Sequence, residues 1–362
     1  MINFANVKEW KIPYNGSLAD VIRVKDTNNT RIIWEKTSIR PGYSDPFWIE
    51  NVSNDNGYVE FKGRDYYGAT MPNITVQYRV NGGSLSSITI SGTTPKYVSI
   101  PANAKVEFYA ETSTWSDGGY PYVGINILNT NYSEISPYPP SVNIGGNILS
   151  MIYGASFRNY SSLPNTAMFY QWLMGCTVVD ASNLCLFEPQ KNGCYESMLS
   201  NCGRLTSAPL LPFTNLTADC YIHMFAYCTS LVTAPVLPAT TATNSCYEGM
   251  FSHCTSLTTA PSLPATTLGE WCYNGMFAYC TSLVTAPVLP ATNLVDECYY
   301  KMFSNCTSLN NVICLATNMN VEDPTYEWLD GVSSTGTFTK AAGVTWPTGT
   351  SGIPSGWTVV NQ

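Results

Sequence analysis

Hydrophobic and polar positions repeat along the second half of the chain with a period of 26 residues. The repeated phrase reads Cys-Tyr-x-x-Met-Phe-x-x-Cys-Thr-Ser-Leu-x-x-Ala-Pro-x-Leu-Pro, and no insertion interrupts it between Cys176 and Cys306. A fixed period of this size is typical of a unit that cannot bury its own apolar face and stacks on its neighbours. The pattern therefore predicts a solenoid whose constant cysteine, tyrosine, methionine, phenylalanine and leucine positions face inward.

Within each repeat, the Met-Phe pair predicts the buried face of a short helical turn. The Ala-Pro-x-Leu-Pro segment limits the sheet of this solenoid, because proline donates no ladder hydrogen bond. We expect the parallel sheet to be short, or to end at the first proline of each pair. Trp172-Leu173 and Trp328-Leu329 occupy the Met-Phe positions at the two ends of the array, as caps require.

Short alternating runs separated by Gly, Asn, Pro and Ser come before the repeats, and they predict a β-sandwich of the Ig-like kind. Further upstream, Val21–Lys25 and Arg31–Glu35 alternate around a turn-forming cluster and predict a hairpin. The sandwich strands are expected at Phe47–Val52, Gly57–Lys62, Ile74–Val80, Ser87–Ser91, Lys96–Ile100, Lys105–Ala110 and Tyr122–Leu128.

The chain is therefore predicted to be mainly β with short helical turns. A single hairpin cannot bury enough surface to be stable alone in water, so we expect Trp10, Ile12 and Trp34 to pack against either the next domain or a partner protein. The expected units are a hairpin element with its linker (1–43), the β-sandwich (44–140), the solenoid with its N-terminal cap (141–332) and a C-terminal cap (333–362).

The charge balance argues against a nucleic-acid partner. Asp and Glu number 25 against 17 Lys and Arg, which leaves a formal net charge of −8 and no basic stripe to neutralise phosphates. The first residues lack the features of a signal peptide, and no run approaches the roughly 18 apolar residues of a membrane span. We therefore expect neither export by a signal peptide nor insertion into a membrane.

Eleven of the 13 cysteines belong to two columns at the repeat spacing, and Cys185 and Cys314 lie outside both columns. Stacked thiols could reach bonding distance, but a column of equivalent thiols has no preferred pairing and the total is odd. The favoured interpretation is a small buried hydrophobe in each coil, with the state of Cys185 and Cys314 left open. No CxxC pair occurs, so we expect neither a metal nor another cofactor.

No set of residues suggests catalysis, and we expect the protein not to be an enzyme. Glycan cleavage needs two carboxylates that flank a cleft. The acids of the repeats are scattered, and only His223 and His253 could serve a nucleophile. The scattered acids are Asp219, Glu248, Glu270, Asp296 and Glu297.

Candidate contact residues are those that vary from coil to coil, because the constant ones are occupied with stacking. The most attractive position holds Tyr227, His253, Tyr279 and Asn305. Aromatic rings in Gly-rich loops of the sandwich, Trp115 and Tyr120 among them, are a second candidate surface for sugars. In both sets, ordinary solvated or tucked side chains are the competing interpretation.

The coil phrase, in forms such as Cys280-Thr-Ser-Leu-Val-Thr-Ala-Pro-Val-Leu-Pro and Cys298-Tyr-Tyr-Lys-Met-Phe-Ser-Asn-Cys, resembles the BspA-like leucine-rich repeats. These repeats occur in surface adhesins of gut Bacteroidales and in virion proteins of the tailed phages that infect them. The resemblance covers roughly residues 142–362 and implies a leucine-rich-repeat solenoid with a role in adhesion. The chain departs from the family pattern where Ala-Pro-x-Leu-Pro replaces the commoner Leu-x-x-Ile-x-Leu strand.

The start of the chain, Phe4-Ala-Asn-Val-Lys-Glu-Trp-Lys-Ile-Pro, is similar to structural proteins of such phages, the crAss-like group among them. The resemblance implies a head or tail fibre on the virion surface, with residues 1–36 bound to other virion proteins and the solenoid directed at a host protein or glycan. Because fibres gain avidity from several weak sites, a homotrimer or homodimer is expected. A bacterial cell-surface adhesin is the alternative, and a glycan depolymerase is a third hypothesis.

Overall fold

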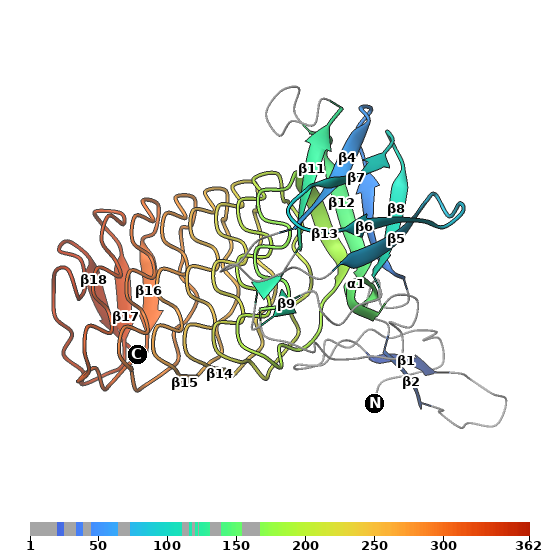
Figure 1. Ribbon diagram of the computed structural model, residues 1–362. Helices are drawn as coiled ribbons and strands as arrows, with labels where there is room; N and C mark the ends of the chain where they lie inside the picture. Colours follow the sequence, from blue (N-terminus) through green and yellow to red (C-terminus); the bar gives the residue numbers. More distant parts are fainter. Residues whose placement is uncertain are drawn as a thin grey trace.

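The computed structural model describes residues 20–24, 34–38, 45–63, 73–110, 116–117, 120–121, 123–130, 139–153 and 167–362. Over these residues the protein is mainly β, and their one helix is the short α1 (Ser150–Tyr153). Figure 1 shows a group of twisted sheets at one end of the molecule and a long stack of coils that extends away from them.

Two sheets form the first part of the molecule. One has six strands in the order β13-β12-β3-β8-β5-β6, and the other has three in the order β11-β4-β7. The strands are β3 (Phe47–Asn51), β4 (Gly57–Gly63), β5 (Ile74–Val80), β6 (Ser86–Ile90), β7 (Lys96–Ile100), β8 (Lys105–Ala110), β11 (Val123–Asn129), β12 (Val142–Asn147) and β13 (Val178–Cys185).

The seven strands expected between Phe47 and Leu128 are confirmed to within one residue at each end. Their alternation has the expected cause, since residues at every second position along β4 and β8 are buried. Phe61 of β4 and Phe108 of β8 meet between the two sheets with ring centroids 5.5 Å apart. The two sheets therefore share one core.

Further strands lie outside these two sheets. β1 (Asp20–Val24) pairs antiparallel with β2 (Trp34–Ser38), so the second strand begins three residues later than the pattern predicted. The short β9 (Ser116–Asp117) and β10 (Tyr120–Pro121) also pair antiparallel. Trp10, Ile12 and the predicted turn at residues 26–30 lie outside the described residues.

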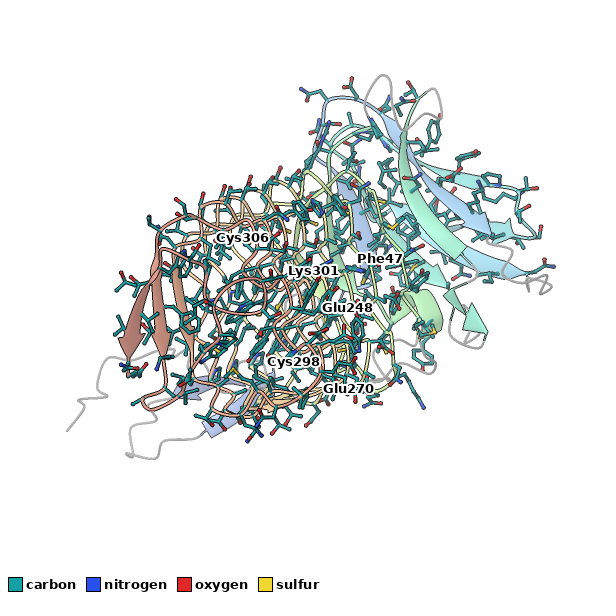
Figure 2. The ribbon with its side chains drawn as sticks, turned by 90° about the vertical axis from the view of Figure 1, so that its left-hand side faces the viewer. Phe47, Glu248, Glu270, Cys298, Lys301 and Cys306 are labelled. Atoms are coloured by element: carbon teal, nitrogen blue, oxygen red, sulfur yellow. The ribbon has the colours of Figure 1, made fainter. Side chains whose placement is uncertain are left out.

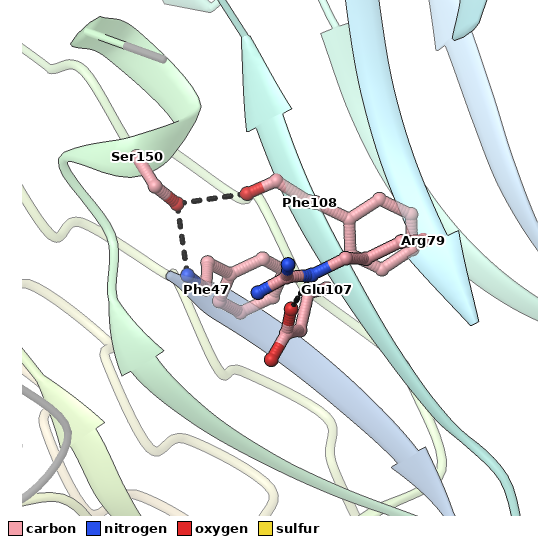
Figure 3. A network of polar contacts seen from close by, with 5 residues as sticks. All are labelled: Phe47, Arg79, Glu107, Phe108 and Ser150. Atoms are coloured by element: carbon pink, nitrogen blue, oxygen red, sulfur yellow. Dashed lines mark hydrogen bonds and ion pairs between the residues drawn. The ribbon is translucent and has the colours of Figure 1, made fainter. Parts of the chain in front are cut away.

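The sheets and the coils are joined by continuous packing. β12 pairs antiparallel with β3 and parallel with β13, so it links the sheets to the first coil. The Ser150 hydroxyl accepts a hydrogen bond from the Phe47 N–H at 2.8 Å and donates one to the Phe108 carbonyl at 2.9 Å. Figure 3 shows both bonds beside the ion pair between Arg79 and Glu107. The predicted boundary between residues 140 and 141 thus lies just before β12, and one core crosses it.

A ladder of backbone hydrogen bonds joins each coil to the next. In one coil, every second N–H donates to a carbonyl 25 residues further along the chain. The N–H groups between them donate to the carbonyl three residues back, which closes a series of tight turns. The donors to the next coil are Gly193, Tyr195, Ser197, Leu199 and Asn201, and their acceptors are Ala218, Cys220, Ile222, Met224 and Ala226.

These turns contradict the predicted short helical turn in each coil. A helical turn would direct its N–H groups to carbonyls four residues back, whereas here half of them bond to the neighbouring coil. Every fourth residue has a positive φ, for example Ser197 (54°) and Asn201 (60°), and such residues interrupt a right-handed helix. We call residues 193–202 and their equivalents in the other coils the turn segments.

In the interior of the stack, equivalent side chains of successive coils form columns of the same or similar residues. Tyr195 and Tyr221 are fully buried, and their rings stack with centroids 5.9 Å apart. All 13 cysteines are buried, and none forms a disulfide. The Cys228 thiol donates to the Leu199 carbonyl at 3.2 Å, and burial raises the pKa of Cys254 to about 12. The cysteines therefore pack as small hydrophobes with a weak donor.

The strands of the stack are short, as the proline positions predicted. β14 (Thr241–Ala242) and β15 (Thr267–Leu268) have two residues each. Longer strands appear at the two ends of the described stack, where another residue replaces the first proline and its N–H can join a ladder: Asn183 in β13 near the N-terminal end, and Ile313 near the C-terminal end. There β16 (Asn311–Cys314), β17 (Thr337–Lys340) and β18 (Thr358–Asn361) form a parallel sheet in that order.

Tryptophans close the C-terminal end of the core. Trp328 is fully buried, stacks on Trp346 with centroids 5.3 Å apart, and donates its indole N–H to the Gly352 carbonyl at 2.9 Å. The predicted cap residues Trp172-Leu173 are likewise buried at the other end of the stack. In the described part of the chain, no helix has the length and apolar character needed to cross a membrane.

Candidate functional site

The turn segments place three side chains of each coil in left-handed positions. Most residues between them supply the buried columns, so the left-handed residues vary in type from coil to coil, as does the partly exposed position before each second one, which holds Glu196, Ile222, Glu248, Asn274 and Tyr300. The third left-handed position of successive coils holds Asn201, Tyr227, His253, Tyr279, Asn305 and Gly331. We call this set the third column.

Four residues predicted from sequence variation, Tyr227, His253, Tyr279 and Asn305, lie in successive coils of the third column. The Tyr227 and His253 rings stack with centroids 4.2 Å apart, and the His253 and Tyr279 rings do so at 4.3 Å. Tyr227 remains 48% exposed and Tyr279 43% exposed. Each ring covers a face of its neighbour, so the inner ring offers only its edge to a ligand.

The ring stack is neutral near pH 7. Desolvation by the surrounding protein lowers the pKa of His253, so its imidazole is uncharged there. The stack can therefore offer tyrosine hydroxyls and imidazole nitrogens as uncharged donors and acceptors. The same contacts also join three coils, so a structural contribution accompanies any binding role.

A second group of side chains lies beside the third column in the coil that contains Tyr279. Trp271, Gly275 and Tyr279 are its three left-handed residues, and Trp271 is 38% exposed. A side chain at Gly275 would have met no atom within 4 Å, so the space between the two aromatic positions is open. At the equivalent Gly249 in the preceding coil, the His223 imidazole fills that space. We call the opening over Gly275 the notch.

The notch is bounded on the next coil by Tyr300 and Lys301. Trp271 and Tyr300 have ring centroids 6.2 Å apart. Lys301 bonds to Glu327 at 3.2 Å and lies over the Tyr300 ring, so its charge is already partnered. The notch therefore offers aromatic surface with an ion pair at its edge. The contribution of Trp271 was not predicted from the sequence.

A group of carboxylates lies on the turn segments of the coils that precede the notch. Burial, together with the charges of Asp219 and Glu248, raises the pKa of Glu196 to about 7. Burial also raises the pKa values of Asp219 and Glu248 themselves. The prediction that Asp219 and Glu248 lie scattered is therefore wrong, because the turn segments bring them within interaction distance of each other and of Glu196. Figure 2 labels Glu248 of this group and Lys301 at the edge of the notch.

These acids do not form a metal site with their neighbours. Among the described residues, no group of three or more His, Cys, Asp or Glu side chains could hold a metal ion. The excess of carboxylates over Lys301 makes the surface locally negative. It therefore favours neutral ligands and disfavours phosphate and other anions.

A separate shallow groove of about 450 Å³ lies in the proline-containing segments. Ser262 stands there in the position that Val236 and Val288 occupy in neighbouring coils, and the smaller side chain leaves the space. The lining residues are Ala260, Pro261, Ser262, Leu263, Pro264, Pro287, Val288 and Pro290. The groove has no polar side chain except Ser262, so it offers little to orient a ligand.

The remaining predicted contact residues are only partly described. Trp115 lies outside the described residues, and the backbone of Tyr120 belongs to β10. Trp34 begins β2, while Trp10 and Ile12 are not described. Their suggested roles in sugar binding and in anchoring stay predictions.

Comparison of the chain with protein-family models, with curated proteins and with solved structures found no match.

Proposed function

We propose that the protein is an adhesive binding protein in which the coil stack contacts a surface ligand through the third column and the notch. In this proposal the two sheets are an Ig-like β-sandwich and the coils a leucine-rich-repeat solenoid. The proposal depends on one observation about the turn segments, in which constant and variable residues occupy different environments. Constant residues are buried, whereas variable left-handed positions expose Tyr227, Trp271 and Tyr279. Exposed aromatic residues of this size are enriched where proteins bind partners.

A neutral glycan is the ligand class that this surface supports best. Sugars present apolar C–H faces and many hydroxyls, and the surface combines an exposed indole with uncharged hydroxyl and imidazole groups. The nearby carboxylates Glu196, Asp219 and Glu248 disfavour an acidic polysaccharide. Because the face is shallow, each copy is expected to bind weakly, and multivalent presentation would supply the avidity.

We further propose that the chain is a head or tail fibre subunit of a phage virion. This part is supported by the resemblance of its repeats and of its first residues to virion proteins of Bacteroidales phages. The antiparallel pair β1–β2 would belong to the element that binds other virion proteins. A bacterial surface adhesin would use the same binding face, so the location of the protein separates the two.

The test compares variants for binding to host cells and to an array of neutral and acidic glycans. The double substitution Tyr227→Ala/Tyr279→Ala and the single Trp271→Ala should each reduce binding at least tenfold. Val236→Ala/Val288→Ala removes exposed apolar side chains from the proline-containing segments and is the matched control. Unchanged binding by both aromatic variants would refute the proposed face. Release of reducing ends during incubation would instead indicate glycan cleavage.

A further inference from the structure

The C-terminal sheet of the stack ends in an uncovered strand. β18 pairs with β17 on one side and is the last strand of its sheet, at the end of the stack farthest from the large sheets (Figure 1). All four of its residues are exposed, and Val359 and Val360 are 45% and 42% exposed. The tryptophans of the cap cover the core of the last coil but leave this edge open.

The pairing with β17 determines which backbone groups of β18 face outward. The N–H groups of Thr358 and Gln362 donate to carbonyls on the β17 side, at Gly336 and Lys340. In a parallel pair the bonding residues alternate, so Thr358, Val360 and Gln362 face β17. The N–H and C=O groups of Val359 and Asn361 therefore point away from the sheet, where no other described strand pairs with them.

Apart from its short length, this edge has none of the features that usually prevent strand pairing. Proteins commonly protect an edge strand with a lysine, a proline or a bulge. β18 reads Thr-Val-Val-Asn and contains none of these. By contrast, the outer strand β7 of the three-stranded sheet begins with Lys96.

The end of the stack is also nearly uncharged. Between Gly331 and Gln362 the only charged side chain is Lys340, which donates to the Val344 carbonyl and to the Asn361 side chain. A chain with a net charge of −8 repels a second copy over most of its surface. The neutral end is therefore where two copies can approach at the smallest electrostatic cost.

We propose that β18 binds β18 of a second copy of this chain, antiparallel and about a two-fold axis. The outward groups fix the register. If Val359 of each copy lies opposite Asn361 of the other, all outward N–H and C=O groups of both residues are paired, and Val360 lies opposite its own equivalent. The contact is self-complementary, as a two-fold interface requires. It would place the two coil stacks end to end, with the large sheets at opposite ends of the dimer.

The dimer should be weak in dilute solution. A four-residue strand supplies few contacts compared with the ~1,000 Å² of buried surface typical of a stable interface. Dimerisation should therefore depend on concentration and become complete only when the two copies are held together. A covalent cross-link is therefore the suitable test, because it accumulates even when the dimer is only weakly populated at low concentration.

The trap is the substitution Val360→Cys in the full chain. In the proposed register the two introduced cysteines form a non-hydrogen-bonded pair about 4.5 Å apart at Cα, within disulfide range. The 13 native cysteines are buried, so the new thiol is the accessible one. Val359→Cys is the matched control, because it lies opposite Asn361 and its own equivalent is more than about 7 Å away, too far for a disulfide. Mild oxidation should convert Val360→Cys to a covalent dimer at least ten times faster than Val359→Cys.

Sedimentation of the wild-type chain and of variants without an introduced cysteine provides the second measurement. The wild-type chain should show a monomer–dimer equilibrium that Val359→Pro abolishes, because proline removes an outward N–H and leaves the bonds to β17 in place. Val359→Thr keeps that N–H and should dimerise normally. A wild-type chain that stays monomeric at several hundred micromolar and equal cross-linking of both cysteine variants would overturn the proposal. Concentration-dependent association without preferential Val360→Cys cross-linking would overturn the register and the two-fold pairing.

Discussion

Replacing a left-handed residue of a turn segment by glycine should change the free energy of unfolding by an amount that can be estimated. Ser197 has a φ of 54° and is buried, and the equivalent positions in two later coils are Gly249 and Gly275. A non-glycine residue in this conformation costs roughly 1–2 kcal/mol. Glycine avoids that cost but loses roughly 0.5–1 kcal/mol more conformational entropy on folding. Ser197→Gly should therefore raise the free energy of unfolding by about 0.5–1 kcal/mol.

Two control variants separate the backbone from the side chain. Ser197→Ala removes the same hydroxyl but keeps the left-handed cost, so it should leave stability nearly unchanged. Ser252 lies outside the left-handed positions, and its equivalents Ala226 and Ala278 show that the site accepts a small side chain. Ser252→Gly should lower the free energy of unfolding by about 0.5–1 kcal/mol.

The assay is urea unfolding of the full chain, followed by circular dichroism and by hydrogen exchange of the turn-segment amides. Hydrogen exchange is needed because stacked coils can open locally before the whole chain unfolds. The reasoning is refuted if Ser197→Gly and Ser252→Gly destabilise the protein equally, since the turn segments would then have no left-handed requirement.

Three further predictions concern pH, thiols and the cap. Because the folded-state pKa of Glu196 is raised to about 7 from an ordinary 4.5, the folded state binds more protons between these values. Unfolding midpoints should fall as the pH rises through that window, and Glu196→Gln should reduce the fall. Native protein should expose no reactive thiol at pH 8, whereas urea-unfolded protein should expose all 13 to a thiol reagent. Trp328→Ala should cost about 3–5 kcal/mol and increase hydrogen exchange in β17 and β18 first.

The sequence predicted the strands between Phe47 and Asn129 well for a physical reason. One face of each sheet is buried, so alternation and turn residues leave little freedom in strand position. The proline positions also predicted the short strands of the stack. The longer strand β16 has Ile313 in place of the first proline, so its N–H groups can all join the ladder. These features depend on local patterns that a single sequence contains.

The turn segments show why the helical prediction failed. The buried residues Cys194, Tyr195, Met198, Leu199 and Cys202 have a spacing that suits one face of a helix, and a turn repeating every four residues gives the same spacing. Only hydrogen bonds to the next coil distinguish the two, and those are not local. Glycine and asparagine at left-handed positions, such as Gly193, Asn201 and Gly249, were a signal that could have indicated turns.

The candidate site was predicted in part. Variation between coils indicated Tyr227, His253, Tyr279 and Asn305, because a repeat of fixed length keeps equivalent residues in register. Trp271 was missed, because its role depends on the open space over Gly275, which separates it from Tyr279 and is visible only in the structure. The clustering of Glu196 with Asp219 and Glu248 was also missed, because it requires the three-dimensional path of the turn segments.

The most direct test of the central claim is to image purified phage particles of the source with an antibody against the coil stack. The proposed fibre predicts label on projections from the capsid or tail, and loss of that label when residues 1–36 are deleted. Label confined to bacterial envelopes, with none on the particles, would contradict the virion assignment and identify the protein as a surface adhesin.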